Sequence, residues 1–269
     1  MKRRAIVVLS SIALLVCYAP TLRGMIEQWT TDEDMGHGFI VPVVILWIIW
    51  RDRDRYGALR VQPSWWGLAL LAVGATMQCF SVLGAGLFAG SVGLLFSVAG
   101  AVLFLGGFRL LQSSLFLFLL ALFMLPKLAI VYNQATLPLQ LLASRMAASM
   151  LTVAGVGVIR EGAILDVGGH RVAVVDACNG IRYLLPLGFM ALVFGYLSDP
   201  KPWMRSALLV AAVPIAIVAN AVRVAASAYV PALSAGFLHS LSGWLIFVVC
   251  LAALMFARYV FNSVSARHA

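Results

Sequence analysis

Long apolar runs recur along almost the whole chain, and they limit the folds that it can adopt. A helix needs about 20 mostly apolar residues to cross the hydrocarbon layer of a bilayer, and fewer if flanking side chains reach the interface. We therefore expect an all-α polytopic membrane protein with about eight transmembrane helices. The eight candidate runs cover residues 5–21, 39–50, 65–83, 87–105, 110–125, 181–197, 206–226 and 241–259.

The balance of charge supports a membrane protein and indicates its orientation. Of the 269 residues, 63% are hydrophobic and only 11% are charged, whereas a soluble domain exposes far more charge. The net charge of +9 would suggest nucleic acid in a soluble protein, but the basic residues lie mostly at the ends of apolar runs. We therefore expect no nucleic-acid partner, lipid as the surroundings, and a location in the cytoplasmic (inner) membrane with both termini in the cytoplasm. The first run is then a transmembrane helix rather than a signal peptide.

The segment between the fifth and sixth runs is predicted to lie outside the membrane. This extracytoplasmic insertion covers about residues 127–177, and its first part, 133–153, suits an interfacial amphipathic helix. Two β-prone runs follow at 158–166 and 170–175, and Gly168-Gly169 between them predicts a small β-hairpin. No internal repeat is visible, so we expect one transmembrane domain over residues 1–269 without a C-terminal soluble domain.

Three reactive side chains are predicted to gather at the extracytoplasmic face. Cys178 opens the sixth apolar run, Arg223 lies near the outer end of the seventh, and His239 precedes the eighth. Free N–H groups at a helix N-terminus favour a thiolate, and a histidine can take the thiol proton and return it to a leaving group. An arginine inside an apolar run is costly and usually has a partner or a task, such as stabilising an oxyanion. Asn220 lies three residues earlier on the same helical face.

Each of these residues also has an ordinary structural interpretation. A lone cysteine is often a small buried hydrophobe, as we expect for Cys17, Cys79 and Cys250, and a lone histidine at a span boundary is often interfacial. His37 either lines a pocket or caps the second span. The acidic residues 32–34 form either a solvated loop or a surface that attracts a basic segment. No cysteine pair or metal-ligand spacing is present, so no metal or organic cofactor is expected.

The order of these motifs resembles the exosortase/archaeosortase family of multi-span membrane transpeptidases. The matching pieces are Gly36-His37-Gly38-Phe39-Ile40-Val41-Pro42, Arg160-Glu161-Gly162, Ala177-Cys178-Asn179-Gly180-Ile181-Arg182, Asn220-Ala221-Val222-Arg223-Val224 and His239. Relatives often have Ser or Thr after the cysteine, where this chain has Asn. The resemblance implies a catalytic Cys178, Arg223 and His239. It further implies substrate-binding or supporting roles for His37, Arg160, Glu161, Asn179, Gly180, Arg182 and Asn220.

The resemblance also implies a substrate class. It predicts cleavage of exported proteins that carry a C-terminal tail with a short Pro-Glu-Pro-like motif, one transmembrane helix and a basic end. The cleavage would pass through a cysteine thioester that an unidentified acyl acceptor resolves. The alternative is a transporter or an export subunit that binds an anionic polysaccharide or lipid through Arg223 and the outer histidines. Transporter sites usually lie near the bilayer midplane and often accompany internal repeats.

Overall fold

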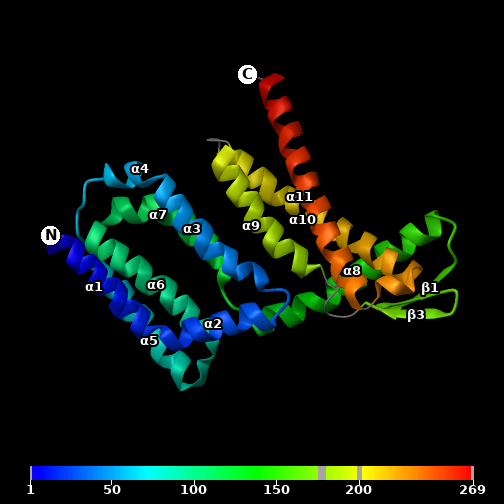
Figure 1. Cartoon of the computed structure of the whole chain (residues 1–269), viewed down its shortest axis with the longest axis horizontal. Helices are drawn as coiled ribbons and strands as arrows, with labels where there is room; N and C mark the ends of the chain where they lie inside the picture. The colour runs from blue at the N-terminus through cyan, green and yellow to red at the C-terminus, as the bar shows by residue number, and fades with distance from the viewer. Residues whose placement is uncertain (1, 175–179, 199–201, 235, 268–269) are drawn as a thin grey trace. The chain divides into compact units, whose positions relative to one another are not determined.

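The chain forms a helical protein with one small antiparallel sheet (Figure 1). The computed structural model describes residues 2–174, 180–198, 202–234 and 236–267. The packing of the chain divides it into two compact units, Met1–Leu128 and Ala129–Ala269, which we call unit 1 and unit 2. Each unit is described by itself.

Unit 1 consists of helices and short helical turns. Its elements are α1 (Lys2–Cys17), α2 (Ala19–Thr31), η1 (Gly36–Phe39), α3 (Ile40–Arg51), α4 (Arg53–Gly57), α5 (Trp66–Phe80), η2 (Ser81–Ala85), α6 (Leu87–Gly106), α7 (Phe108–Ala121) and η3 (Leu122–Met124). The first predicted span is two helices, α1 and α2, bent by 66° at Tyr18. Pro20 explains the break, because a proline fits the first turn of a new helix but not a helix interior.

Helices α5 and α6 form the tightest helix pair of unit 1. A Cβ atom added to Gly67 would lie 2.6 Å from the carbonyl oxygen of Gly100, and one added to Gly74 would collide with Ser97 Oγ. Small residues at such contacts let two helix backbones approach closely, which is a common basis of helix association in lipid. The Tyr18 hydroxyl lies 2.7 Å from Ser97 Oγ of α6, which ties the α1–α2 bend to this helix.

Unit 2 combines four long helices with the sheet. Its elements are α8 (Ala129–Val153), β1 (Val158–Glu161), β2 (Ile164–Val167), β3 (His170–Ala173), α9 (Ile181–Ser198), α10 (Pro202–Tyr229), η5 (Pro231–Leu233) and α11 (Gly236–Arg267). Helices α9, α10 and α11 share a core that includes Leu187, Leu208 and Leu254. A second core joins α8, α10 and the sheet around Leu165.

The predicted hairpin is a three-stranded antiparallel sheet in the order β1-β2-β3. The expected first run, 158–166, is not one strand, because the chain turns at Gly162-Ala163 and pairs Glu161 with Ile164. Gly162 has φ +63°, a conformation that glycine adopts without strain. The second run begins at His170 as predicted, while its last residue lies outside the described residues.

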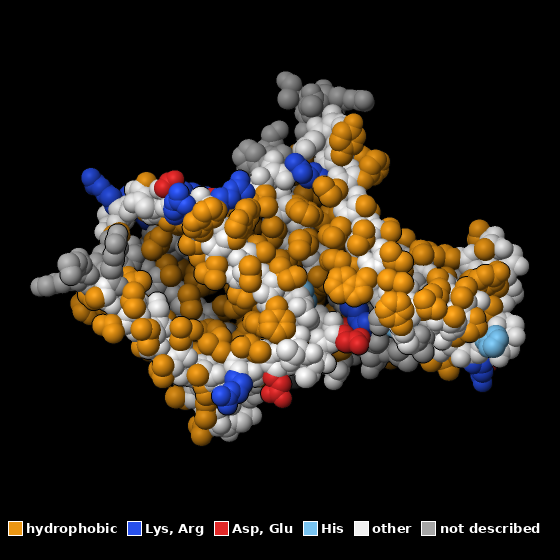
Figure 2. Space-filling model, viewed as in Figure 1, with side chains coloured by type: hydrophobic (Ala, Val, Ile, Leu, Met, Phe, Trp, Pro, Cys, Tyr) orange, Lys and Arg blue, Asp and Glu red, His pale blue; other side chains and the backbone are white. Residues whose placement is uncertain are grey.

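The membrane character of the chain is confirmed, but the count of eight spans is not. By length and composition, five helices of the described chain can cross a bilayer, or six if the bent α1–α2 pair is one span. At about 1.5 Å per residue, α3 with 12 residues reaches only about 18 Å. Large apolar side chains cover much of the visible helix surface, which suits lipid surroundings (Figure 2).

Candidate active site

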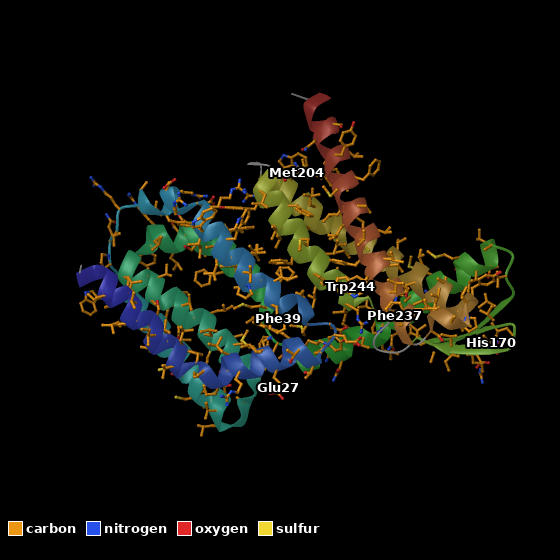
Figure 3. The ribbon with its side chains drawn as sticks, viewed as in Figure 1. Glu27, Phe39, His170, Met204, Phe237 and Trp244 are labelled. Carbon is orange, nitrogen blue, oxygen red and sulfur yellow. The ribbon has the colours of Figure 1, made fainter. Side chains whose placement is uncertain are left out.

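Three helix ends of unit 2 meet around one buried arginine. Helix α9 begins there, α10 approaches its C-terminus there, and α11 starts there after the η5 turn. Figure 3 labels Phe237 and Trp244 on the N-terminal part of α11, on either side of His239 in the sequence. His239 therefore lies in the first turn of α11.

Arg223 is the largest fully buried side chain among the described residues, with 1% of its surface exposed. The apolar sequence of α10 carries it into the protein together with Asn220, which is 2% exposed and lies one helical turn earlier. Within the described parts of the chain, Arg223 Nε and Nη1 have no hydrogen-bond partner. Buried donors without partners are costly and rare, so this arginine has donors to spare for another group.

His239 is fixed by a hydrogen bond at each ring nitrogen. Its Nδ1 lies 2.9 Å from the carbonyl oxygen of Leu233, and its Nε2 lies 2.8 Å from Arg223 Nη2. A carbonyl oxygen only accepts and a guanidinium only donates, so Nδ1 carries the proton and Nε2 presents its lone pair to Arg223. His239 is therefore a neutral imidazole, held in one tautomer by the backbone of η5.

Tyr183 and Gly243 complete the surroundings of the arginine. The guanidinium carbon of Arg223 lies 5.7 Å from the centre of the Tyr183 ring, within the range of a cation–π contact. A Cβ atom added to Gly243 would lie 3.4 Å from the Tyr183 hydroxyl oxygen and 3.5 Å from Arg223 Nη2. An alanine at position 243 would therefore be in ordinary van der Waals contact with both side chains.

Gly180 brings the start of α9 to the same place. It has φ +87°, and an added Cβ would lie 3.4 Å from the side chain of Asn220. Its carbonyl oxygen accepts hydrogen bonds from the N–H groups of Tyr183 and Leu184 and so begins the helix. The predicted nucleophile Cys178 and its neighbour Asn179 lie outside the described residues.

The other residues of the predicted site in unit 2 have separate positions. Arg182 lies half-buried in the first turn of α9. Arg160 and Glu161 are exposed on β1, where Arg160 donates to the carbonyl oxygen of Gly162 and Glu161 pairs with Arg171. Their interactions stabilise the sheet and its turn, and their predicted role in substrate binding stays a prediction.

His37 lies in unit 1, where it fastens the η1 turn to the end of η3. Its Nε2 is 2.9 Å from the carbonyl oxygen of Phe123 and its Nδ1 is 3.1 Å from that of Asp34. Both partners are acceptors, so both hydrogen bonds form together only when the ring is protonated. Burial lowers the pKa of His37, while the two hydrogen bonds and the nearby Asp34 carboxylate oppose that shift. Burial is the largest of these effects, so the pKa of His37 lies below its ordinary value.

The acidic residues beside His37 are not simply a solvated loop. Asp34 is buried, and Lys127 Nζ lies 2.7 Å from a carboxylate oxygen of Asp34 and 2.7 Å from one of Asp32. These two ion pairs, together with the hydrogen bond from the Trp29 indole N–H to the carbonyl oxygen of Met124, join the segment at the end of α2 to the segment that follows α7. The interpretation of these carboxylates as fully solvated is therefore wrong for Asp34.

Comparison with known protein families identifies the family of this chain. The sequence pattern that defines the family described as "Transmembrane exosortase (Exosortase_EpsH)" matches residues 29–256. The chain belongs to the transmembrane exosortase family. The match covers most of the chain, including Arg223, His239 and the segment around Cys178. Searches of curated proteins and of solved structures gave no significant match.

Sequence reasoning missed three parts of the site. Tyr183 stood out from the apolar residues of its span only by its position in the first turn after Gly180. Gly243 follows His239 by four residues and so lies on the same helical face, a spacing that could have been noticed. The Leu233 carbonyl that orients His239 gives no side-chain signal, and only Pro231 indicated a turn there.

Proposed function

We propose that this chain is a membrane cysteine protease or transpeptidase that removes the C-terminal sorting tail of exported proteins. Membership of the exosortase family supports this class of activity. The observation that carries the residue assignment is the hydrogen bond between the buried Arg223 and His239, with Gly180 against the adjacent Asn220. The substrates would end in a Pro-Glu-Pro-like motif, a transmembrane helix and a basic segment.

Chain connectivity supports Cys178 as the nucleophile. Only one residue separates Cys178 from Gly180, so their Cα atoms can be at most about 7 Å apart. Gly180 lies against Asn220, which is one turn from Arg223 on α10. We propose that this short tether brings the thiol to His239, whose two hydrogen bonds define its tautomer.

The first chemical step would acylate the cysteine. The thiol proton passes to His239 Nε2, and the Cys178 sulfur attacks the carbonyl carbon of the scissile peptide bond. In the resting structure, His239 Nε2 accepts a hydrogen bond from Arg223 Nη2. When Nε2 takes the thiol proton, Arg223 would have to turn Nη2 toward the carbonyl oxygen that becomes negative. When the tetrahedral intermediate collapses, the C–N bond breaks, and the leaving amine takes the proton from Nε2. The remaining product is a thioester on Cys178.

The second step would release the acyl group. A nucleophile, either an amine of an acceptor molecule or water, attacks the thioester carbon and gives its proton to His239 Nε2. The C–S bond then breaks, and the proton returns to the Cys178 sulfur. Throughout both steps, the bond from Nδ1 to the Leu233 carbonyl keeps the ring in the tautomer that the chemistry needs.

Arg223 would stabilise the negative charge that forms in each step. The neutral imidazole of His239 compensates none of the charge of Arg223. The Nε and Nη1 groups of Arg223 have no partner in the described parts of the chain. Donors that are already oriented in a buried site stabilise an oxyanion more than donors in water would. The orientation proposed from the basic residues puts this site on the extracytoplasmic face, where exported proteins arrive.

The test uses a secreted reporter fused to a tail with a Pro-Glu-Pro-like motif, a transmembrane helix and a basic end. The reporter is co-expressed with the wild-type chain, with Cys178→Ala, or with Cys79→Ala as a matched control, because Cys79 is exposed on α5. We expect tail removal with wild type and Cys79→Ala and none with Cys178→Ala. A covalent enzyme–reporter adduct that hydroxylamine releases would identify the thioester.

Two results would refute the proposal. One is tail removal by Cys178→Ala at the wild-type rate. The other is an adduct that persists in Cys178→Ala, which would move the nucleophile elsewhere. The side of the active site is tested separately, by labelling Cys178 with a membrane-impermeant maleimide in intact spheroplasts and in inverted vesicles. Labelling only in inverted vesicles would contradict the extracytoplasmic assignment.

A further inference from the structure

Strand β3 is an edge strand with backbone groups that point away from the sheet. The N–H of Val174 donates to the carbonyl oxygen of Ala163 at 2.8 Å, which continues the pairing of β2 with β3 by one residue. In an antiparallel ladder, such bonded residues alternate with residues whose N–H and C=O face the other way. His170 and Val172 therefore bond to β2, whereas Arg171 and Ala173 present their backbone groups to the open edge.

No described part of the chain pairs with this edge. The sheet order is β1-β2-β3, and the backbone hydrogen bonds found among the described residues include none to the outward groups of Arg171 or Ala173. In Figure 1, β3 lies at the margin of unit 2. Unpaired edges readily add another strand, and proteins that avoid this use short edge strands, charged side chains, proline or a bulge there. Strand β3 has four residues and carries the charged Arg171, but it has no proline and its register with β2 is continuous.

The side chains of β3 leave the edge accessible. The Arg171 guanidinium pairs with Glu161 of β1, so it extends over the face of the sheet and across β2. Ala173 is exposed and small. The inner face of the sheet is already occupied, because Leu165 and Val174 pack against α8 and α10. An approaching partner therefore meets main-chain groups at this edge.

The position of this edge along the chain identifies its partner. Ala173 precedes Cys178 by five residues, and the strand pairing still holds at Val174. We infer that an extended segment of the substrate, next to the bond to be cleaved, adds to β3 as a fourth strand. This inference rests on the proposed function. Because the contacts are main-chain hydrogen bonds, the occupant is an unfolded peptide segment rather than a helix or a lipid.

Strand addition would also align the substrate for the reaction. Pairing at Arg171 and Ala173 fixes the direction and register of the peptide, since backbone bonds recur at every second residue. Because Cys178 follows Ala173 by only five residues in the sequence, this register would set the position of the scissile bond relative to the proposed nucleophile. Recognition would require an extended conformation of the substrate tail. The side chains of the substrate would then decide which extended peptides bind best.

The experiment removes one outward N–H without touching the β2–β3 ladder. Proline has no N–H and is tolerated on edge strands where the N–H faces solvent, so Ala173→Pro blocks strand addition. Ala173→Ser is the matched control, because it keeps the N–H at the same position. Val158→Pro is the second control, because the same alternation points the Val158 N–H away from β2 at the other edge. All variants are full-length chains in membrane vesicles with the tailed reporter.

We expect the KM for the reporter to rise about tenfold in Ala173→Pro, as loss of a main-chain hydrogen bond implies, with kcat within about twofold of wild type. Ala173→Ser and Val158→Pro should behave like wild type. Alkylation of Cys178 by iodoacetamide, measured with Cys17, Cys79 and Cys250 replaced by alanine, should proceed at one rate in every variant. That rate reports the state of the nucleophile independently of peptide binding.

Three results would overturn the inference. Ala173→Pro could process the reporter with the KM of Ala173→Ser. Ala173→Pro could lower both kcat and the rate of Cys178 alkylation, which would show that the substitution damages the nucleophile. A dimer could be lost with KM unchanged, which would assign the edge to a second copy. In each case, processing by wild type and not by Cys178→Ala would leave the proposed function standing.

Discussion

Replacing Arg223 with lysine gives the sharpest test of the proposed site. Arg223 donates a hydrogen bond from Nη2 to His239 and lies over the Tyr183 ring. Its Nε and Nη1 groups have no hydrogen-bond partner among the described residues. A lysine ammonium preserves the charge but places all its donors at one point, so it cannot hold His239 and also present a fork to an oxyanion. We therefore expect Arg223→Lys to lower kcat although the positive charge is retained.

The size of the effect follows from the number of donors lost. Removing one oxyanion donor typically costs about 10²–10³ in kcat, or about 2.7–4 kcal/mol. We expect Arg223→Lys to lose at least that much in kcat. Arg223→Met should abolish activity but leave thermal stability equal or higher, because it removes a buried charge that no carboxylate pairs among the described residues.

The assay is single-turnover removal of the tail from the reporter in vesicles, with thermal stability measured in detergent. Arg205→Lys is the matched control, because Arg205 also lies on α10 and over a tyrosine ring, that of Tyr196, at 4.9 Å. This control should keep kcat. The reasoning is refuted if Arg223→Lys retains kcat within threefold of wild type, or if Arg205→Lys loses as much.

Three further predictions concern other contacts. His239→Ala should lower kcat by about 10²–10⁴, the usual contribution of a general acid–base, without preventing Cys178 alkylation; the rates of tail removal and of alkylation check this. Gly74→Val should destabilise unit 1 by about 1–3 kcal/mol or more, because its side chain would overlap Ser97 Oγ; thermal unfolding in detergent checks this. Because burial lowers the pKa of His37 below its ordinary 6.5, the unfolded chain takes up the proton first. Stability should therefore be full above that pH and fall as the pH drops through it, and thermal scans from pH 7.5 to 5.5 should lose this dependence in His37→Gln.

Hydropathy located two of the long helices to within about one residue at each end. The run at 87–105 became α6, Leu87–Gly106, and the run at 181–197 became α9, Ile181–Ser198. It failed where local backbone chemistry cuts an apolar run. Pro20 starts a new helix inside the first run, and Gly162 starts a turn inside a run of strand-forming residues. Both residues were visible in the sequence, and each breaks the element whose apolar pattern continues through it.

The site was less accessible to sequence reasoning than the helices. The cost of burying a charge singled out Arg223, but its pairing with a histidine 16 residues later depends on how α10 and α11 pack. The motif around His37 has a local explanation in unit 1: a Cβ on Gly38 would collide with the Trp29 indole, and His37 itself bonds to backbone carbonyls. The tautomer of His239 could not be predicted from the residue types, because the group that fixes it is the backbone carbonyl of Leu233.

Arg223 pairs with a neutral imidazole instead of a carboxylate. A buried arginine that only stabilises a fold is usually compensated by a carboxylate, as Lys127 is by Asp32 and Asp34 in unit 1. Among the described residues, Arg223 has no such partner, and its nearest polar neighbour can only accept one hydrogen bond. Within residues 2–174, 180–198, 202–234 and 236–267, the resting site therefore offers Arg223 no carboxylate partner and leaves its Nε and Nη1 donors unused. The proposed reaction supplies the missing negative charge only when the tetrahedral intermediate forms, and binding energy that appears only at that stage accelerates the reaction instead of tightening the ground state.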